Sequence, residues 1–255
     1  MTVLTAGQLQ SLHVQIRHVP ASAPLKWLDQ AWEDLRHIGA PGLAHGALIA
    51  ILGAVLLMLG SSHIYFIAAA VSGYLLVGPV MTTGLCELAR RRAARESLSF
   101  DESLQGMTRN LDGLMHFGAV LALVAIVWFA LAALLLQTAL SAAPPSLAVA
   151  LWGGSANLTA AQWLGFIVCG AVLAAAVFTV SVVAVPLIID RHARATEAVR
   201  ISMQATLANL PAMLVWAALI VAITALGFVT LLVGMVIVAP LLGYATWHAY
   251  RDLIG

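Results

Sequence analysis

The chain has 255 residues, of which 62% are hydrophobic and only 9% are charged, and its formal net charge is +1. Soluble domains carry about 45–50% apolar and about 25% charged residues, so a water-soluble domain of this size could not hide so much apolar surface. The near-zero charge and the absence of a basic run exclude a nucleic-acid partner. We therefore expect an all-α, polytopic membrane protein whose main partner is the lipid bilayer.

The chain begins with a polar segment, 1–21, which we predict to be a cytoplasmic N-terminal tail. We assign 22–255 to a single membrane domain. Apolar residues then recur at spacings of three and four over 24–38, which predicts an amphipathic helix lying in the membrane surface. Trp27 and Trp32 in this helix are typical of interface anchors in the headgroup region.

Six apolar segments follow, and we predict six transmembrane helices. Pro79, Pro186 and Pro240 fall in the second, fourth and sixth segments, where each is expected to break its helix. Two more amphipathic segments, 97–112 and 195–210, precede the third and fifth spans. The predicted spans cover 41–60, 64–89, 114–140, 163–189, 211–226 and the remainder of the chain after a turn near Gly227.

The order of surface helix, span, turn and proline-broken span occurs three times, which we interpret as three hairpin repeats. When Pro41, Asp112 and Pro211 are placed in register, two pairs of polar residues also coincide: Asn110 with Asn209, and Ser103 with Ser202. The alternative is that any six apolar helices with prolines near the interface show such echoes. The repeats cover approximately 24–95, 97–194 and 195–255.

All Lys, Arg, Asp and Glu residues lie on one side of this six-span layout. The other side, made of 60–63, 141–162 and the turn near Gly227, carries no charge. The positive-inside rule then places both termini in the cytoplasm. At the charged ends, Glu87 can pair with Arg91, and Asp190 with Arg194, because each pair is four residues apart on a helix.

Three histidines occupy the predicted cytoplasmic ends of different spans: His45, His116 and His248. They are weak candidates for a haem or metal site, since neutral imidazole is a common ligand for both. No pair has the spacing of a preformed site, so we favour hydrogen bonding at the interface. We accordingly expect no resident metal and no cofactor.

The closing stretch from Pro240 ends in aromatic residues and an arginine. Its Trp247, Tyr250 and Arg251 are typical of interface anchors that fix the depth of a helix. No charged residue lies in the middle of a span, which argues against ion-coupled transport. No nucleophile elbow, Walker-type loop or clustered catalytic carboxylates occur, so we expect no catalytic residues and no enzymatic activity.

Several runs together resemble a family of bacterial predicted integral membrane proteins, domain of unknown function 2189. They are Trp27-Leu28-x-x-Ala31-Trp32-x-Asp34-Leu35-Arg36, Pro41-x-Leu43-Ala44-x-Gly46, Gly78-Pro79 and the closing stretch from Pro240 to Arg251. The resemblance implies a multi-pass protein of the bacterial inner (plasma) membrane. Some relatives are labelled cytochrome c oxidase subunit I-like, although the oxidase core resembles a larger bundle with its own set of histidines.

The leading hypothesis is a non-enzymatic scaffold, assembly or accessory factor that binds a membrane protein or a second copy of itself. The first alternative is a permeation pathway for small molecules or lipids, because hydroxyl residues are scattered through the spans. The second alternative is a haem- or metal-binding accessory protein of a respiratory oxidase.

Overall fold

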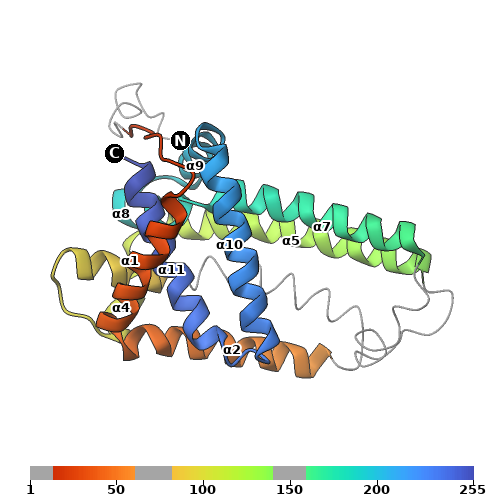
Figure 1. Cartoon of the computed structure of the whole chain (residues 1–255), viewed down its shortest axis with the longest axis horizontal. Coiled ribbons are helices and arrows are strands. Elements are labelled where there is room, and N and C mark those ends of the chain that lie inside the picture. The colour runs from red at the N-terminus through yellow and green to blue at the C-terminus, as the bar shows by residue number, and fades with distance from the viewer. Residues whose placement is uncertain (1–13, 61–81, 140–158) are drawn as a thin grey trace.

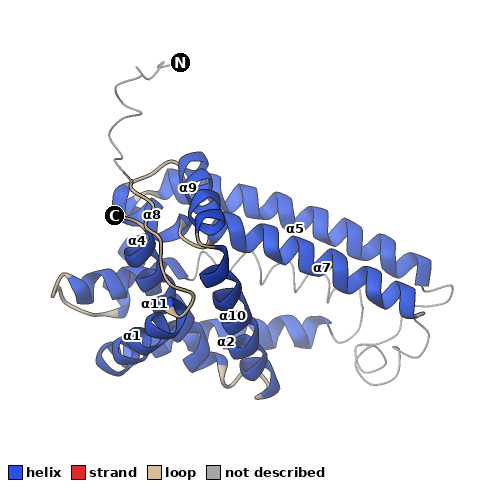
Figure 2. Ribbon diagram, turned by 45° about the horizontal axis from the view of Figure 1, so that its top comes forward, coloured by secondary structure: helices blue, strands red, loops and turns tan. Residues whose placement is uncertain are grey.

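The computed structural model describes residues 14–60, 82–139 and 159–255, and these residues are predominantly helical (Figures 1 and 2). The all-helical prediction is confirmed for this part of the chain. Its one β-bridge joins Ile16 to Ile254. Residues 82–93 are helical as well. The helices are α1 (Ala23–Ile38), α2 (Ala40–Gly60), α4 (Phe100–Arg109), α5 (Leu111–Ala139), α7 (Ala160–Ser181), α8 (Ala184–Arg191), α9 (Ala195–Ala208), α10 (Leu210–Val229) and α11 (Met235–Leu253).

A shorter helix meets a long apolar helix across a single residue at three places. The joint residues are Gly39, Asn110 and Asn209. They coincide when the three predicted repeats are placed in register at Pro41, Asp112 and Pro211. At Gly39 the backbone has a positive φ of 61°, and its amide donates a hydrogen bond to the carbonyl of Leu35. Glycine allows this conformation without steric cost, so α1 and α2 can meet at 105°.

Within the described ranges, three stretches are long and apolar enough to cross a membrane, and the bent α1–α2 pair would be a fourth. α5 alone has 29 residues, which is roughly 43 Å at about 1.5 Å per residue and exceeds a hydrocarbon core of about 30 Å. Most of the predicted second span, with Pro79, lies outside the described residues. The three stretches are Leu111–Trp128, Ile167–Arg191 and Leu210–Val229.

The prolines act differently from one another. α7 ends at Ser181 and α8 begins at Ala184, so the expected break near Pro186 is present. It precedes the proline because Pro186 has no N–H to bond the carbonyl of Val182. Pro240, predicted to break its helix, instead lies inside α11, which is helical throughout. A proline can remain inside a helix when the carbonyl it leaves without a donor is accommodated by a neighbour.

That carbonyl belongs to Val236, and α2 packs directly against it. A Cβ atom added at Gly46 would collide with the oxygen and carbonyl carbon of Val236. Gly46 therefore lets α2 approach α11 at the turn that Pro240 disturbs. The chain folds back just before this point, through a turn after α10 in which Leu231 and Leu232 have positive φ. α10 runs to Val229 and is longer than the predicted fifth span, 211–226.

The core lies where α1, 82–93, α8, α9, α10 and α11 meet, whereas α5 and α7 lie side by side and extend away from it (Figure 1). Trp27 is fully buried and packs edge-on against Trp216 of α10, with ring centroids 5.9 Å apart. Trp247 and Tyr250 are buried too. The structure thus corrects the anchor assignment of Trp27, Trp247 and Tyr250. Their rings are packed in the protein interior, so they are not available to the headgroup region.

Candidate functional site

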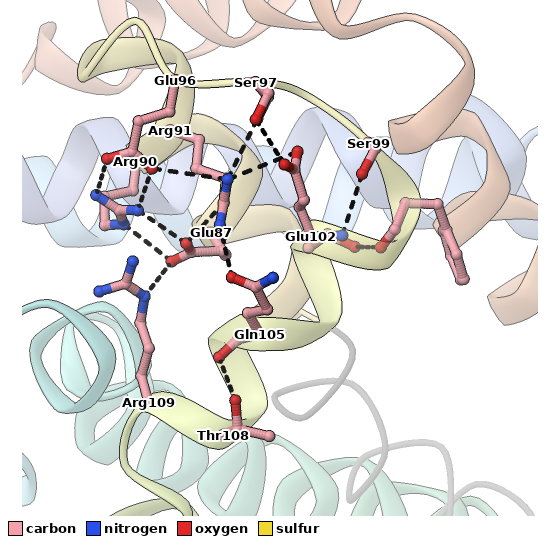
Figure 3. Close-up of polar contacts among 12 residues, drawn as sticks. Glu87, Arg90, Arg91, Glu96, Ser97, Ser99, Glu102, Gln105, Thr108 and Arg109 are labelled. Carbon is pink, nitrogen blue, oxygen red and sulfur yellow. Dashed lines mark hydrogen bonds and ion pairs between the residues drawn. The ribbon is translucent and has the colours of Figure 1, made fainter.

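The most deeply buried charge in the described chain is the carboxylate of Glu87, whose side chain is fully inaccessible to solvent. Arg90 and Arg91, from the same helical stretch, contact it at 2.9 and 3.0 Å. Arg109, at the end of α4, reaches it at 2.9 Å (Figure 3). A buried carboxylate is costly unless it is paired and hydrogen-bonded, and these three guanidinium groups provide that pairing.

Acidic side chains around the cluster offset the positive charge of the arginines, and an amide side chain accepts a further hydrogen bond. Arg90 also binds Glu96, at 2.8 Å, and Arg91 donates to Gln105 at 2.8 Å. The hydrogen bond from Arg90 lowers the pKa of the exposed Glu96 carboxyl. The pKa of Glu102 is lowered too, mainly by a hydrogen bond from Ser97. The cluster is therefore close to neutral and its polar groups face one another rather than an outside ligand.

α4 is held against this cluster by its own sequence. Ser99 is extended, and its hydroxyl accepts a hydrogen bond from the amide of Glu102 at 3.2 Å, which begins the helix. Gly106 faces Glu87, and a Cβ atom there would lie 2.8 Å from the Cβ of Glu87. A small residue is needed at this contact so that Arg109 can reach the carboxylate.

A second buried cluster joins α1 to α11. Asp34 of α1 is 5% exposed. It forms an ion pair with Arg92, and its other oxygen lies 2.9 Å from Nε2 of His248. One turn further along α11, Asp252 accepts a hydrogen bond from the indole of Trp27 at 2.9 Å. Both α1 contacts therefore secure the same neighbouring helix.

Polar contacts also hold α8 and α9 in place. Tyr250 donates to Asp190 at 2.6 Å, so Asp190 uses this partner in place of the predicted Arg194. The Ser202 hydroxyl donates to the carbonyl of Thr179 at 2.8 Å and accepts from the amide of Val183 at 3.4 Å. It thereby satisfies backbone groups freed by the break between α7 and α8.

The three candidate histidines have separate partners. His45 is 3% exposed, with Nδ1 3.0 Å from the carbonyl of Pro41 and Nε2 3.2 Å from the Ser103 hydroxyl. His116 is exposed and lies 3.3 Å from Asp112. With His248 on Asp34, the histidines do not assemble one ligand set. Among the described residues, no three His, Cys, Asp or Glu side chains form a group that could hold a metal ion.

The remaining predicted anchors are at the surface. Trp32 is 40% exposed, and the guanidinium of Arg36 lies 5.2 Å from its ring centroid. Arg251 is exposed. The pairing of Glu87 with Arg91 follows the helical spacing that the sequence shows. The parts played by Arg109, Asp34 and His248 carry no local signal, because each contact joins segments far apart in the chain.

Comparison with known families bears on these same segments. Residues 66–190 match the family described as predicted integral membrane protein (DUF2189). The resemblance inferred from the sequence is confirmed over this range, and membrane location fits the apolar helices. The DUF2189 match includes the Glu87 cluster and its partner Arg109. No curated protein and no solved structure matches the chain.

Proposed function

We propose that this chain is a non-enzymatic membrane scaffold, assembly or accessory factor. The observation that supports this proposal is how the buried polar groups are used. Glu87 ties 82–93 to α4, and Asp34 ties α1 to α11. Ser202 ties α9 to the end of α7. Each contact joins a surface helix to another part of the bundle. Polar groups used in this way hold helices in fixed positions, as a scaffold requires.

The same contacts favour a threefold repeat arranged as a ring. In our proposal, each surface helix packs on the second hairpin arm of another repeat. α9 of the third repeat contacts α7 and α8 of the second, and α1 of the first contacts α11 of the third. α4 of the second repeat contacts 82–93 of the first through Gly106. Such an arrangement closes the ring with one type of contact used three times.

We further propose that the chain crosses the bacterial inner membrane six times, with both termini on the cytoplasmic side. The asymmetry of charge supports this topology, since the ion pairs described above join segments that the six-span layout places on one side. The turn between α10 and α11, Thr230–Gly234, carries no charge. In this layout it faces the outside.

The hairpin of α5 and α7 is where we propose that a membrane-protein partner or a second copy binds. It extends away from the core (Figure 2). Its outer surface is apolar, with Leu123, Ile126, Ile167 and Val172 each at least 60% exposed. In a membrane these side chains contact either lipid tails or another protein.

Photocrosslinking in native membranes tests the scaffold proposal. A photoreactive residue is placed at Ile167 on the hairpin, and the matched control carries it at Leu214 on α10, which is 69% exposed. A scaffold predicts one discrete protein adduct from position 167 and lipid adducts from position 214. Lipid adducts alone at both positions, or catalytic turnover by the purified protein, would contradict the proposal.

A further inference from the structure

A cleft of about 280 Å³ lies beside the joint between α4 and α5, facing the segment that links α8 to α9. None of the contacts proposed for the scaffold fills it. Its lining includes Asn110 and His116 from the joint, and His192, Arg194 and Thr196 from the opposite wall. These side chains carry hydrogen-bond donors, and the first of them holds the two walls together.

The Asn110 side chain makes the cleft a fixed structure. Its Nδ2 donates to the carbonyl of Ile188 at 3.2 Å and to that of Ala193 at 2.9 Å. Its Oδ1 accepts a hydrogen bond from the amide of Gly113 at 3.0 Å. One amide thus fixes both the start of α5 and the α8–α9 link, so the cleft exists before any ligand arrives.

The corresponding joint between α9 and α10 also holds an asparagine, but there the side chain binds residues 17–19 of the chain. There Asn209 donates to the carbonyl of Arg17 at 3.0 Å and accepts from the amide of Val19 at 2.9 Å. His18, between these residues, lies 3.1 Å from the carbonyl of Ala208. Residues 17 and 18 are an arginine followed by a histidine. The link between α8 and α9, beside the cleft, has the same pair in Arg191 and His192. His192, however, has a φ of 53° and lines the cleft.

The donors in the cleft suit an anion. Arg194 has no ion-pair partner among the described residues, and guanidinium groups bind phosphate oxygens with matching geometry. Thr196 adds a hydroxyl in the first turn of α9. Asp112 is the acidic residue of the lining, and its side chain is 89% exposed with His116 3.3 Å away. The opposite wall, which His192, Arg194 and Thr196 line, therefore carries no acidic group.

We propose that this cleft binds a phosphate group, carried either by a phospholipid headgroup or by a soluble phosphate. The location fits a headgroup, because α5 begins at Leu111 beside the cleft and runs from there as a membrane-spanning stretch. The proposal is independent of the scaffold role. Failure to bind phosphate leaves the crosslinking result unchanged, and the reverse also holds.

Native mass spectrometry of the full chain in detergent tests the site. Dioctanoyl phosphatidylglycerol and inorganic phosphate are titrated separately, with dioctanoyl phosphatidylcholine as a headgroup of zero net charge. Arg194, the N-cap residue of α9, is changed to Gln, and the control is Arg200→Gln, at an exposed arginine within α9 that does not line the cleft. His192→Asn is a second variant, since asparagine tolerates a left-handed backbone. Unchanged thermal unfolding confirms that each variant is folded.

We expect Arg194→Gln to weaken binding about tenfold or more, because it removes a charge-assisted hydrogen bond, and Arg200→Gln to change it less than about twofold. His192→Asn is expected to weaken binding in the same direction as Arg194→Gln. Binding of phosphatidylglycerol identifies a headgroup site, and binding of inorganic phosphate alone identifies a soluble ligand. Absence of both, or equal losses in the two arginine variants, would overturn the proposal.

Discussion

Glu87 shows how much a single residue can organise in this protein. Its carboxylate is fully buried and pairs with three arginines, and its removal would take one carboxylate partner from each of them. Loss of one member of a buried charge network is more costly than the network's net contribution, because the remaining charges stay desolvated. The sequence indicates the pair with Arg91 by its spacing, but not the long-range contact from Arg109.

We predict that Glu87→Gln destabilises the protein by about 3–5 kcal/mol, because the buried arginines lose their counter-charge. Glu102→Gln is the control, since that side chain is 28% exposed and its ion pair with Arg91 is longer, at 3.6 Å. The control should cost about 1 kcal/mol or less. Unfolding of the purified protein in mixed micelles measures both, and equal losses would show that Glu87 has no special role.

A second residue-scale prediction concerns Gly46. Gly46→Ala places a methyl group against the Val236 carbonyl, which is backbone and cannot rotate away. Overpacking of this kind costs about 1–3 kcal/mol. Gly118→Ala on α5 is the matched control, because nothing lies within 4 Å of the added carbon. It should be neutral or stabilising by up to about 1 kcal/mol. The same unfolding assay decides, and a stable Gly46→Ala protein would contradict the close approach of α2 and α11.

Acid should loosen the cluster around Glu87. The folded-state pKa values of Glu96 and Glu102 lie below the ordinary value of 4.5. The stability they contribute is therefore present above pH 4.5 and is lost as the pH falls through the lower folded values. Thermal unfolding between pH 7 and pH 3 should show this loss, and Glu96→Gln should reduce it. An unchanged acid profile in that variant would exclude the contribution of Glu96.

At the scale of elements, the sequence predicts the helices better than their partners. Apolar spacing places a surface helix at 24–38, and the structure has α1 at Ala23–Ile38. The same spacing cannot reveal which element covers the apolar face. Spacing alone therefore places Trp27 in the headgroup region, whereas in the structure α10 and α11 bury it. Sequence alone also predicts a helix break at Pro240, but α11 is continuous there, and Gly46 of α2 packs against the Val236 carbonyl.

The joint residues give a prediction at this scale. Asn209→Ala removes the amide that holds residues 17–19 against α9, and we expect a loss of about 1–3 kcal/mol. Hydrogen exchange should become faster at Val19, whose amide loses its acceptor. Gln204→Ala, at an exposed position of the same helix, is the control and should leave exchange at Val19 unchanged. Unaltered protection in Asn209→Ala would rule out the joint as a clamp.

At the scale of the whole molecule, composition predicts a membrane protein, and the match of residues 66–190 agrees with it. The number of spans depends on segments such as 64–81, which lie outside the described residues. Hydropathy cannot show how the hairpins pack around one another, because that arrangement depends on a few polar contacts such as Asp34 with His248. The contacts of α1 with α11, and of α9 with α7 and α8, are the observations that support the proposed ring of three repeats.

Cysteine labelling in intact cells is the most direct test of the proposed six-span topology. Cys86 and Cys169 are first replaced by alanine, and single cysteines are introduced at Leu231, which is 87% exposed, and at Arg95. With six spans and cytoplasmic termini, we expect a membrane-impermeant maleimide to label position 231 in intact cells and position 95 only after the membrane is permeabilised. Labelling of both positions from the same side of the membrane would contradict this topology.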